Sequence, residues 1–350
     1  MHDVARIAGV SIKTVSNVIN DYPHVRPGTR DRVNQAIEQL DYRPNLSARG
    51  LRSGRTGVIG LAVPSLRENY FAELADSVIR AAEKRGLGVM VEQTGGQRDA
   101  ELRAVSTSRP RFLDGLLFSP VSLGQADTEA LTVDAPLVLL GERIFGGPTD
   151  HVTMHNMSAA RAAVEHLLEI GRRRIALIGA DPENRNETNS ATLRLNGYVS
   201  ALEAAGIEID RSLVRPTRMS EWNRAGGAAA THVMIREGVE FDAVFALNDT
   251  LGLGVLRALR EEGRSVPDDV AVIGFDNIDE SKYSVPSMST VDTGRDEIAA
   301  IAVDRLVERI QEKGERRPPE TFKPAFRLVA RESTGFESTD REERPTASPG

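Results

Sequence analysis

The chain begins MHDVARIAGVSIKTVSNVIN (residues 1–20), and this stretch decides the fold of its N-terminal part. It predicts two short helices joined by a tight turn at Gly9, because glycine readily adopts the positive φ that such turns require. Ser11 is placed to cap the second helix by accepting a hydrogen bond from a free backbone amide. Apolar residues at helical spacing predict the buried faces, namely Val4, Ala5, Ile7 and Ala8 in the first helix and Val15, Val18 and Ile19 in the second.

The outer face of the second predicted helix carries groups that match the edges of DNA bases. In a helix-turn-helix, the second helix enters the major groove with its N-terminal residues on base edges. Lys13 suits guanine acceptors, Asn17 suits the adenine edge, and Ile12 suits the thymine methyl group. The same spacing also fits an ordinary helical hairpin with a polar outer face, so spacing alone leaves both interpretations open.

A third helix is predicted from Arg30 to about Leu40, with Val33, Ile37 and Leu40 as its apolar stripe. Three short helices make a minimal head whose core would be marginal alone. Several polar side chains near the second helix either contact phosphate or stay solvated in a loop, namely Asn20, His24, Arg26 and Thr29.

A linker follows the head, and a short helix is predicted within it, over residues 44–56. This helix would carry Ala48 and Leu51 on one face, with Arg49 and Arg52 beside them. Two interpretations of Leu51 are open. It either packs on the rest of the protein or enters between base steps in the minor groove, as in DNA-bending proteins.

Bulk composition narrows the class of protein. A chain of 350 residues is too long for one core and predicts two or three domains. Residues 1–57 carry nine Lys and Arg against five Asp and Glu, whereas the rest carries 35 against 46. A basic head on an acidic body is expected when only the head approaches phosphate. With no Cys, no apolar signal segment and no long apolar run, we expect a cytoplasmic protein without a membrane span.

From Arg55 onward, short apolar runs alternate with segments of helical period. The first series places strands at 58–63, 87–91, 115–118 and 137–140, with helices at 71–85 and 98–108. The second places strands at 174–179, 213–214, 243–247 and 270–275, with helices at 158–170, 193–205, 224–237 and 250–262. Such alternation predicts parallel sheets covered on both faces, so the expected body is α/β, with two doubly wound lobes beside a small all-α head.

Ligands bind at the carboxyl ends of the strands in such lobes, which places a pocket in the cleft between them. The residues expected there combine planar hydrogen-bonding groups with aromatic faces, and they suit a polyhydroxyl or heterocyclic small molecule. They are Ser65, Tyr70, Phe71, Glu142, Arg194, Trp222, Asn248 and Asp276. For Asn248 and Asp249, helix capping explains the residue type equally well.

Motifs for catalysis are missing from the sequence, which has no G-x-S-x-G elbow, no phosphate-binding P-loop and no H-E-x-x-H. His151 and His155 are four residues apart but lie on a predicted strand and turn, so no metal site is expected, and no cofactor is implied. Residues 337–350 are rich in Glu, Arg, Pro and Ser, and we expect them to be disordered.

A set of motifs runs through the chain from residue 2 to about 334. They are Asp3-Val-Ala, Ala8-Gly-Val-Ser11, Thr14-Val-Ser16, Val18-Ile-Asn20, Tyr42-x-Pro44-Asn45, Ala48-Arg49-x-Leu51-Arg52-x-Gly54, Gly57-Val-Ile-Gly60, Asn69-Tyr-Phe71, Asn248-Asp249, Gly274-Phe-Asp276 and Arg331-Glu-Ser333. In this order they resemble the lactose-repressor (LacI/GalR) family of bacterial transcription regulators.

The resemblance implies a homodimer that binds a pseudo-palindromic double-stranded DNA operator. It implies that Ile12, Lys13 and Asn17 read bases, and that Leu51 is a minor-groove wedge within a hinge helix that forms on the operator. Phosphate would be held by Ser11, Thr14, Ser16, Asn20 and Thr29. In the cleft, the residues at family ligand positions are Phe71, Arg194, Asn248 and Asp276, with Ser65, Glu142 and Trp222 matching less closely.

The resemblance also implies the domain organisation and the switch. The head spans residues 1–43, the hinge 44–56 and a periplasmic-binding-protein-like body 57–336. The first lobe takes about 57–157 plus 290–320, and the second about 158–289 plus 321–336. Binding of a small-molecule effector would reorient the lobes and change the order of the hinge helix, so the two ligands are coupled reciprocally.

Three classes of function each explain part of the sequence. A ligand-responsive transcription regulator, a repressor of carbohydrate-utilisation genes, explains the basic head and the body together. A stand-alone sugar-binding protein of the periplasmic type explains the lobes but not the head, and a two-lobed enzyme lacks motifs. The expected effector is a sugar or sugar derivative, with a nucleobase second.

Overall fold

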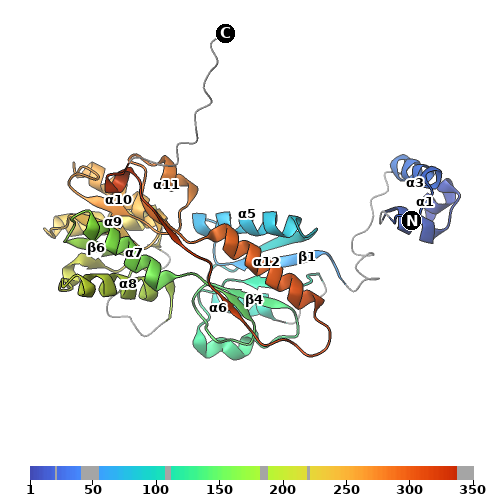
Figure 1. Ribbon diagram of the computed structural model, residues 1–350, viewed down its shortest axis with the longest axis horizontal. Helices are drawn as coiled ribbons and strands as arrows, with labels where there is room; N and C mark the ends of the chain where they lie inside the picture. The colour runs from blue at the N-terminus through green and yellow to red at the C-terminus, as the bar shows by residue number, and fades with distance from the viewer. Residues whose placement is uncertain (20–21, 41–54, 107–111, 182–187, 219–220, 337–350) are drawn as a thin grey trace, which may run out of the picture. The chain divides into compact units, whose positions relative to one another are not determined.

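The computed structural model describes residues 1–19, 22–40, 55–106, 112–181, 188–218 and 221–336 (Figure 1). It divides into two units, a head of residues 1–57 and a body that begins at Val58. Asn20, Ala48 and Leu51, which were predicted to contact DNA, lie outside the described residues. The same holds for most of the predicted hinge helix and for the tail from residue 337.

The head consists of three helices, α1 (His2–Ala8), α2 (Ile12–Ile19) and α3 (Pro27–Gln39). Gly9 ends α1 with a φ of 63°, which confirms the predicted turn. Ser11 Oγ accepts a hydrogen bond from the Thr14 amide at 3.1 Å, which confirms the predicted cap of α2. The third helix begins earlier than Arg30, because Pro27 fits the first helical position, where its missing N–H needs no partner.

The core of the head is small and apolar, with Val4, Val15 and Val33 fully buried. Two residues were wrongly predicted to lie in this core, because Ile7 is 39% exposed and Leu40 is 38% exposed. A turn of 100° per residue places Ile7 beyond the edge of the buried face of α1, and Leu40 lies just after the last residue of α3.

The first lobe contains a six-stranded sheet in the order β11-β5-β4-β3-β1-β2, and all its pairs are parallel. The strands are β1 (Val58–Val63), β2 (Gly88–Gln93), β3 (Leu116–Phe118), β4 (Leu137–Leu140), β5 (Asp150–Val152) and β11 (Thr321–Phe322). Its helices are α5 (Asn69–Glu83), α6 (Arg98–Val105) and α12 (Arg295–Gln311). Helices α5 and α12 lie side by side (Figure 1). Helix α6 ends before the predicted residue 108, because Ser106 has an extended backbone.

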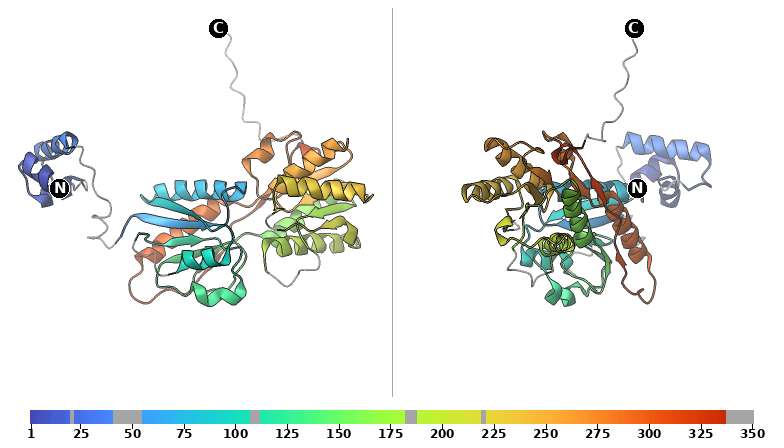
Figure 2. Two further views of the ribbon diagram at one scale, coloured as in Figure 1. Left: turned by 180° about the vertical axis from the view of Figure 1, so that it is seen from behind. Right: turned by 60° about the vertical axis from the view of Figure 1, so that its left-hand side comes forward.

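The second lobe contains a four-stranded parallel sheet in the order β7-β6-β8-β9. The strands are β6 (Ile175–Ile178), β7 (Val214–Arg215), β8 (Ala243–Ala246) and β9 (Ala271–Ile273). The helices are α7 (Asn156–Glu169), α8 (Ser190–Ala204), α9 (Arg224–Arg236) and α10 (Asp249–Glu261) (Figure 2). Two parallel sheets with helices between the strands confirm the predicted α/β class of the body.

The chain passes between the lobes three times, after β5, after β10 (Thr290–Asp292) and after β11. Strand β10 pairs antiparallel with β12 (Arg327–Val329) in a separate two-stranded sheet. Before β10 lies the short helix α11 (Asp279–Tyr283), which follows β9. Strand β11 belongs to the first sheet, so the first lobe extends just beyond the boundary expected at residue 320.

Helices α7 and α8 approach each other closely at Gly197. A Cβ atom at this position would lie 2.3 Å from the backbone oxygen of Met157, so only glycine fits without displacement of the helices. Arg194 lies one turn earlier on α8, and Asn156 begins α7. The close approach therefore brings the Arg194 side chain to Asn156 at the edge of the cleft.

Candidate functional site

A cavity of about 350 Å³ lies between the lobes, at the carboxyl ends of strands from both sheets. Ser119 follows β3, Thr153 follows β5, Asn248 follows β8 and Asp276 follows β9, and all four line the cavity. The size is at the lower end of the range of roughly 300–1,000 Å³ that is usual for small-molecule sites. The cavity is therefore where a ligand site is expected in this architecture.

The structure brings all the predicted cleft residues together around this cavity. They are Ser65, Tyr70, Phe71, Glu142, Arg194, Trp222, Asn248 and Asp276. Lining residues that the prediction missed include Glu68, Gln97, Asn189 and Thr250. Glu68 could have been predicted from the sequence, because it lies between Ser65 and Tyr70 in the connection that follows β1.

Arg194 is the central cation of the cavity and is only 3% exposed. Its Nε donates to Asn156 Oδ1 at 2.8 Å, and its Nη1 donates to the Leu247 carbonyl. Its Nη2 lies 3.5 Å from Asp276 Oδ1 and 3.5 Å from Met154 Sδ. The guanidinium is thus fixed by partners from several elements before any ligand arrives.

Aromatic rings enclose the same guanidinium. Its central carbon lies 3.7 Å from the centre of the Phe275 ring and 5.9 Å from that of Trp222, distances at which cation–π attraction operates. Trp222 is fixed in turn, because its Nε1 donates to the Gly179 carbonyl at 3.1 Å. Across the cavity, Tyr70 and Phe71 pack edge to face with centroids 5.2 Å apart. These rings offer flat apolar surface beside the polar groups.

Asp276 is held in an uncommon backbone conformation, with a φ of 108°, and its side chain is buried. Few residues other than glycine adopt positive φ, and such strain persists only where the surroundings impose it. Burial raises the pKa of the Asp276 carboxyl to about 6, while Arg194 and Arg295 oppose this shift. The conformation turns the carboxylate toward Arg194 and the carbonyl toward Arg295.

Two glutamates give the cavity further acidic character. Burial raises the pKa of Glu142, and the nearby Arg194 lowers it in part. The Oε1 atom of Glu142 is buried and has no hydrogen-bond partner among the described residues. Burial also raises the pKa of Glu68 to about 7, with a further contribution from Asp276.

Asn248 serves as a helix cap and also lines the cavity. Its Oδ1 accepts from the Leu251 amide at 2.7 Å and so caps α10, while its Nδ2 lies 3.5 Å from the Trp222 carbonyl. Asp249 faces away from the cavity, and its fully buried carboxylate accepts from Thr290 Oγ1 and the Ile278 amide. Asn248 therefore fits both predictions, since it caps a helix and lines the cavity, whereas Asp249 does not line the cavity.

The second candidate site is the outer face of α2 in the head. Ser11 and Lys13 are exposed, and Thr14, Ser16 and Asn17 are half-buried. Ile12 was expected to lie outside, but it packs partly against the core of the head. Of the flanking residues, His24 is exposed beside Tyr22, with ring centroids 5.5 Å apart, and Thr29 is half-buried near the start of α3.

The described residues add two negative findings. No group of three or more His, Asp or Glu side chains in this part of the chain is arranged to hold a metal ion. Within the same residues, no helix has both the length and the apolar character to cross a membrane.

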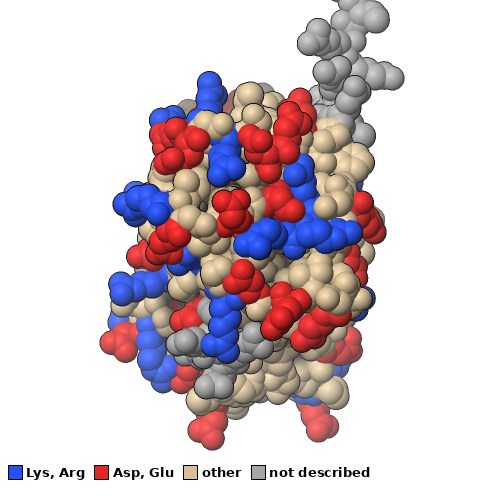
Figure 3. Space-filling view, turned by 90° about the vertical axis from the view of Figure 1, so that its left-hand side faces the viewer, with Lys and Arg blue, Asp and Glu red and all other residues tan. Residues whose placement is uncertain are grey.

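On one face of the body, acidic and basic side chains are interspersed (Figure 3).

Comparison with known proteins gives the same two-part organisation. Residues 1–45 match the lacI family of bacterial regulatory proteins, and residues 164–334 match a periplasmic binding protein-like domain. The HTH-type transcriptional regulator AscG of Escherichia coli K12 is 31% identical over 337 residues, which span 95% of this chain and 97% of AscG.

Solved structures agree. A structure described as a LacI-family transcriptional regulator from Sanguibacter keddieii is 49% identical, with a TM-score of 0.74 over 81% of this chain and all of that one. A complex of the regulator CelR with cellobiose is 32% identical, with a TM-score of 0.68 over 95% of this chain and 98% of that one. The HTH-type transcriptional regulator CelR of Thermobifida fusca is 34% identical over 94% of this chain and 96% of its own length.

A helix-turn-helix head joined to a two-lobed α/β body with a cavity between the lobes defines the class of ligand-responsive DNA-binding transcription regulators. Within this class, the chain belongs to the LacI family.

Proposed function

We propose that this protein is an operator-binding repressor whose DNA affinity is set by a small sugar in the cavity of the body. The observation that carries the proposal is that one chain joins a head with an exposed polar α2 face to a body with a preformed cavity. Helix-turn-helix regulators bind two half-sites as dimers, so the active form is a homodimer on a pseudo-palindromic operator. The protein acts by binding rather than by catalysis, and it acts in the cytoplasm, where its DNA target lies.

In the head, we assign base reading to Ile12, Lys13 and Asn17 on α2. Phosphate contacts are assigned to Ser11, Thr14, Ser16, Asn20 and Thr29. The hydroxyls of Ser11 and Thr14 already hydrogen bond to each other at 2.9 Å, which fixes them at the start of α2. Leu51, together with Ala48, is assigned the minor-groove contact at the centre of the operator.

Lys13→Ala should weaken operator binding by roughly 1–3 kcal/mol, because a base contact is lost, and should relax specificity at one base pair. The measurement is fluorescence anisotropy at fixed salt, on an operator selected from random DNA. Arg6→Ala is the control, since Arg6 lies on α1 and pairs with Asp3 at 3.0 Å. An equal loss of affinity for random DNA would show that Lys13 contacts only phosphate.

The charge of the cavity supports an uncharged sugar over a phosphorylated one. Glu68, Glu142 and Asp276 line it, while Arg194 is already bonded to protein acceptors. Arg143 also lines it, and its Nε donates to the Leu123 carbonyl at 3.1 Å. Among the cavity residues that the structure describes, a phosphate would face carboxylates while both arginines are already bonded to protein acceptors, whereas a hydroxyl donates readily to the free Oε1 of Glu142. CelR, a relative with the same fold, has been solved with cellobiose.

A thermal-shift panel tests this assignment with uncharged mono- and disaccharides, their phosphate esters, and nucleosides. A ligand at about 100 times its Kd adds about 2.7 kcal/mol to the free energy of unfolding. We expect a hit among uncharged sugars and none for the phosphate ester of that sugar. Glu142→Gln should weaken the hit roughly 10- to 100-fold through a lost charge-assisted hydrogen bond, whereas the exposed Glu129→Gln should not.

Each alternative hit has a definite meaning in this panel. A nucleoside that stabilises the protein while sugars do not would replace the sugar proposal. A phosphorylated sugar that binds better than its parent would contradict the charge argument.

A further inference from the structure

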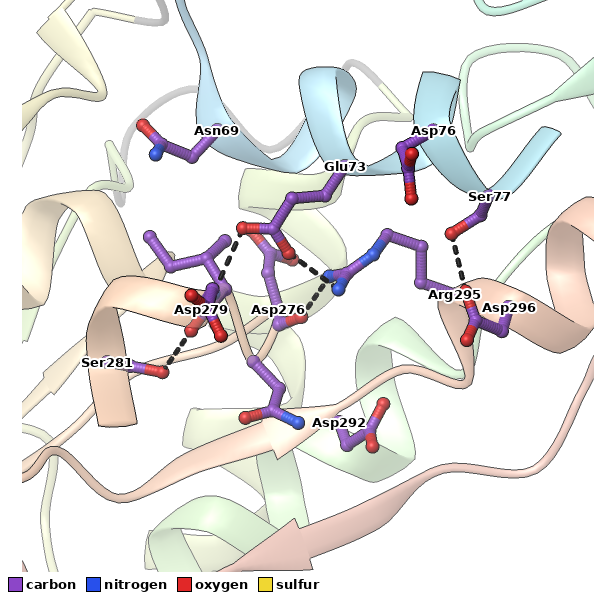
Figure 4. Close-up of polar contacts among 12 residues, drawn as sticks. Asn69, Glu73, Asp76, Ser77, Asp276, Asp279, Ser281, Asp292, Arg295 and Asp296 are labelled. Atoms are coloured by element: carbon purple, nitrogen blue, oxygen red, sulfur yellow. Dashed lines mark hydrogen bonds and ion pairs between the residues drawn. The ribbon is translucent and has the colours of Figure 1, made fainter. Parts of the chain in front are cut away.

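Arg295 is the first residue of α12 and lies outside the cavity, yet it contacts a cavity residue. Its Nη1 donates to the backbone carbonyl of Asp276 at 3.2 Å, and its Nη2 pairs with Glu73 Oε2 at 2.6 Å (Figure 4). The side chains of Arg295 and Glu73 are 19% and 24% exposed, so this ion pair is largely shielded from water.

Glu73 lies on α5, and its carboxylate serves two partners. While Oε2 pairs with Arg295, Oε1 accepts from the backbone amide of Asp279 at 2.9 Å (Figure 4). Asp279 opens α11, which follows the second sheet, as Asp276 does. One carboxylate and one guanidinium thus tie the segment 276–279 of the second lobe to two helices of the first lobe.

Neighbouring polar contacts join α5 to α12 within the first lobe. Asp296 accepts from Ser77 at 2.5 Å (Figure 4). It also accepts from Arg80 at 3.0 Å, and both contacts stay within the first lobe. Arg295, the adjacent residue on α12, instead reaches across to the second lobe. Asp296 therefore joins α12 to α5 within the first lobe, whereas Arg295 joins the first lobe to the second.

We propose that Arg295 is a positioning residue of the effector cavity, which fixes the strained backbone of Asp276 and, through Glu73, makes the orientation of its carboxylate depend on closure of the lobes. The inference rests on the proposed function only in that Asp276 contacts the effector. When the lobes separate, the Arg295 contact to the Asp276 carbonyl and the Glu73 contact to Asp279 are lost together. A ligand that engages the Asp276 carboxylate then favours the closed arrangement.

The lobe arrangement is measurable without any effector, because the chain contains no cysteine to interfere with labelling. Spin labels on Glu129→Cys in the first lobe and Glu208→Cys in the second, both exposed positions, report the distance between the lobes. Dilution with unlabelled protein removes distances between subunits. Arg295→Met and Glu73→Gln are expected to lengthen the mean distance, and Arg295→Lys to restore it in part.

Arg80→Met is the matched control, because Arg80 pairs with Asp76 and Asp296 inside the first lobe. It should leave the distance unchanged. If both Arg295→Met and Glu73→Gln give the distance distribution of the unmodified pair, the proposal is overturned. Since this readout contains no sugar, its result is independent of whether the sugar assignment holds.

A second readout separates positioning from general stability. With the sugar that gives the thermal-shift hit, Arg295→Met should weaken binding roughly 2- to 30-fold, the range seen for residues that couple sites without touching the ligand. Arg295→Lys should recover part of this loss. Binding that stays unchanged in Arg295→Met, in a protein that unfolds at the normal temperature, would contradict the positioning role.

Discussion

Arg194→Met is expected to lower the free energy of unfolding of the body by about 3–5 kcal/mol and to abolish the effector response. The substitution preserves length but leaves the buried Asp276 carboxylate without its cation, which is the costly way to break a buried ion pair. It also leaves the Leu247 carbonyl and Asn156 Oδ1 without their donor. Response to the effector is lost because the guanidinium is part of the cavity wall.

Trp222 makes this measurement specific to the body. It is the single tryptophan of the chain and it lies beside Arg194, so its fluorescence during urea unfolding reports the body and not the head. Arg257→Met is the control, because its pair with Glu261 is on the surface and the side chain is 72% exposed. Surface pairs contribute about 0–1 kcal/mol. A variant at position 194 as stable as the unmodified protein would refute the anchoring role.

The body is expected to lose about 2 kcal/mol of stability as the pH rises from 6.5 to 8.5. Burial raises the pKa of Asp249 from 3.8 to about 8, and it raises the pKa of Glu68 to about 7. Between the ordinary and the raised pKa, the folded protein binds more protons than the unfolded chain, so the free energy of unfolding falls with rising pH. For Asp249 alone the slope approaches 1.36 kcal/mol per pH unit below its folded pKa.

Histidines limit the window in which this slope is visible. Burial lowers the pKa of His151 and His166 below 6.5, so their contribution is lost as pH falls and opposes the carboxylates in acid. At pH 6.5 these histidines are still half protonated in the unfolded chain, so they offset part of the carboxylate effect up to about pH 7.5, above which the carboxylate effect dominates. The measurement is the urea midpoint of Trp222 fluorescence at pH 6.5, 7.5 and 8.5.

Asp249→Asn is the informative variant for this pH dependence. Its amide keeps both hydrogen bonds, because Oδ1 accepts from Ile278 while Nδ2 donates to Thr290 Oγ1, whose hydroxyl reverses its role. The slope above pH 6.5 should then flatten, with stability at pH 8.5 raised toward its value at pH 6.5. A slope that persists in the variant would assign the effect to another group.

The sequence predicted the wall of the cavity well, because one rule places most of its residues. Parallel strands end at one edge of a sheet, so side chains such as Glu142 and Asp276 were placed together from the strand pattern alone. Arg194 comes from a helix, and it was expected in the cleft from its place in the strand and helix pattern, with the resemblance to a family as further support. Its burial and its many partners did not follow, since they depend on how closely Gly197 lets α8 approach α7.

Other features were beyond the sequence for a similar reason. The contact of Arg295 with Glu73 joins positions more than 200 residues apart, and no local pattern marks such a pair. Ile7 and Leu40 were misplaced because apolar residues at the edge of a short helical face have no neighbour to cover them. The assigned DNA contacts at Asn20, Ala48 and Leu51 remain predictions.

Because the chain passes between the lobes three times, the lobes cannot be separated by a single proteolytic cut or exchanged by a single recombination event. Each lobe is assembled from separate stretches of sequence, with α12 and β11 returning to the first lobe after the second has been built. A single protease nick after β5 or after β10 therefore leaves two fragments that still share the first sheet, because β11 belongs to the later fragment in both cases. For the same reason neither lobe corresponds to one continuous stretch of gene, so recombination at a single point exchanges parts of both lobes rather than one ligand-binding half.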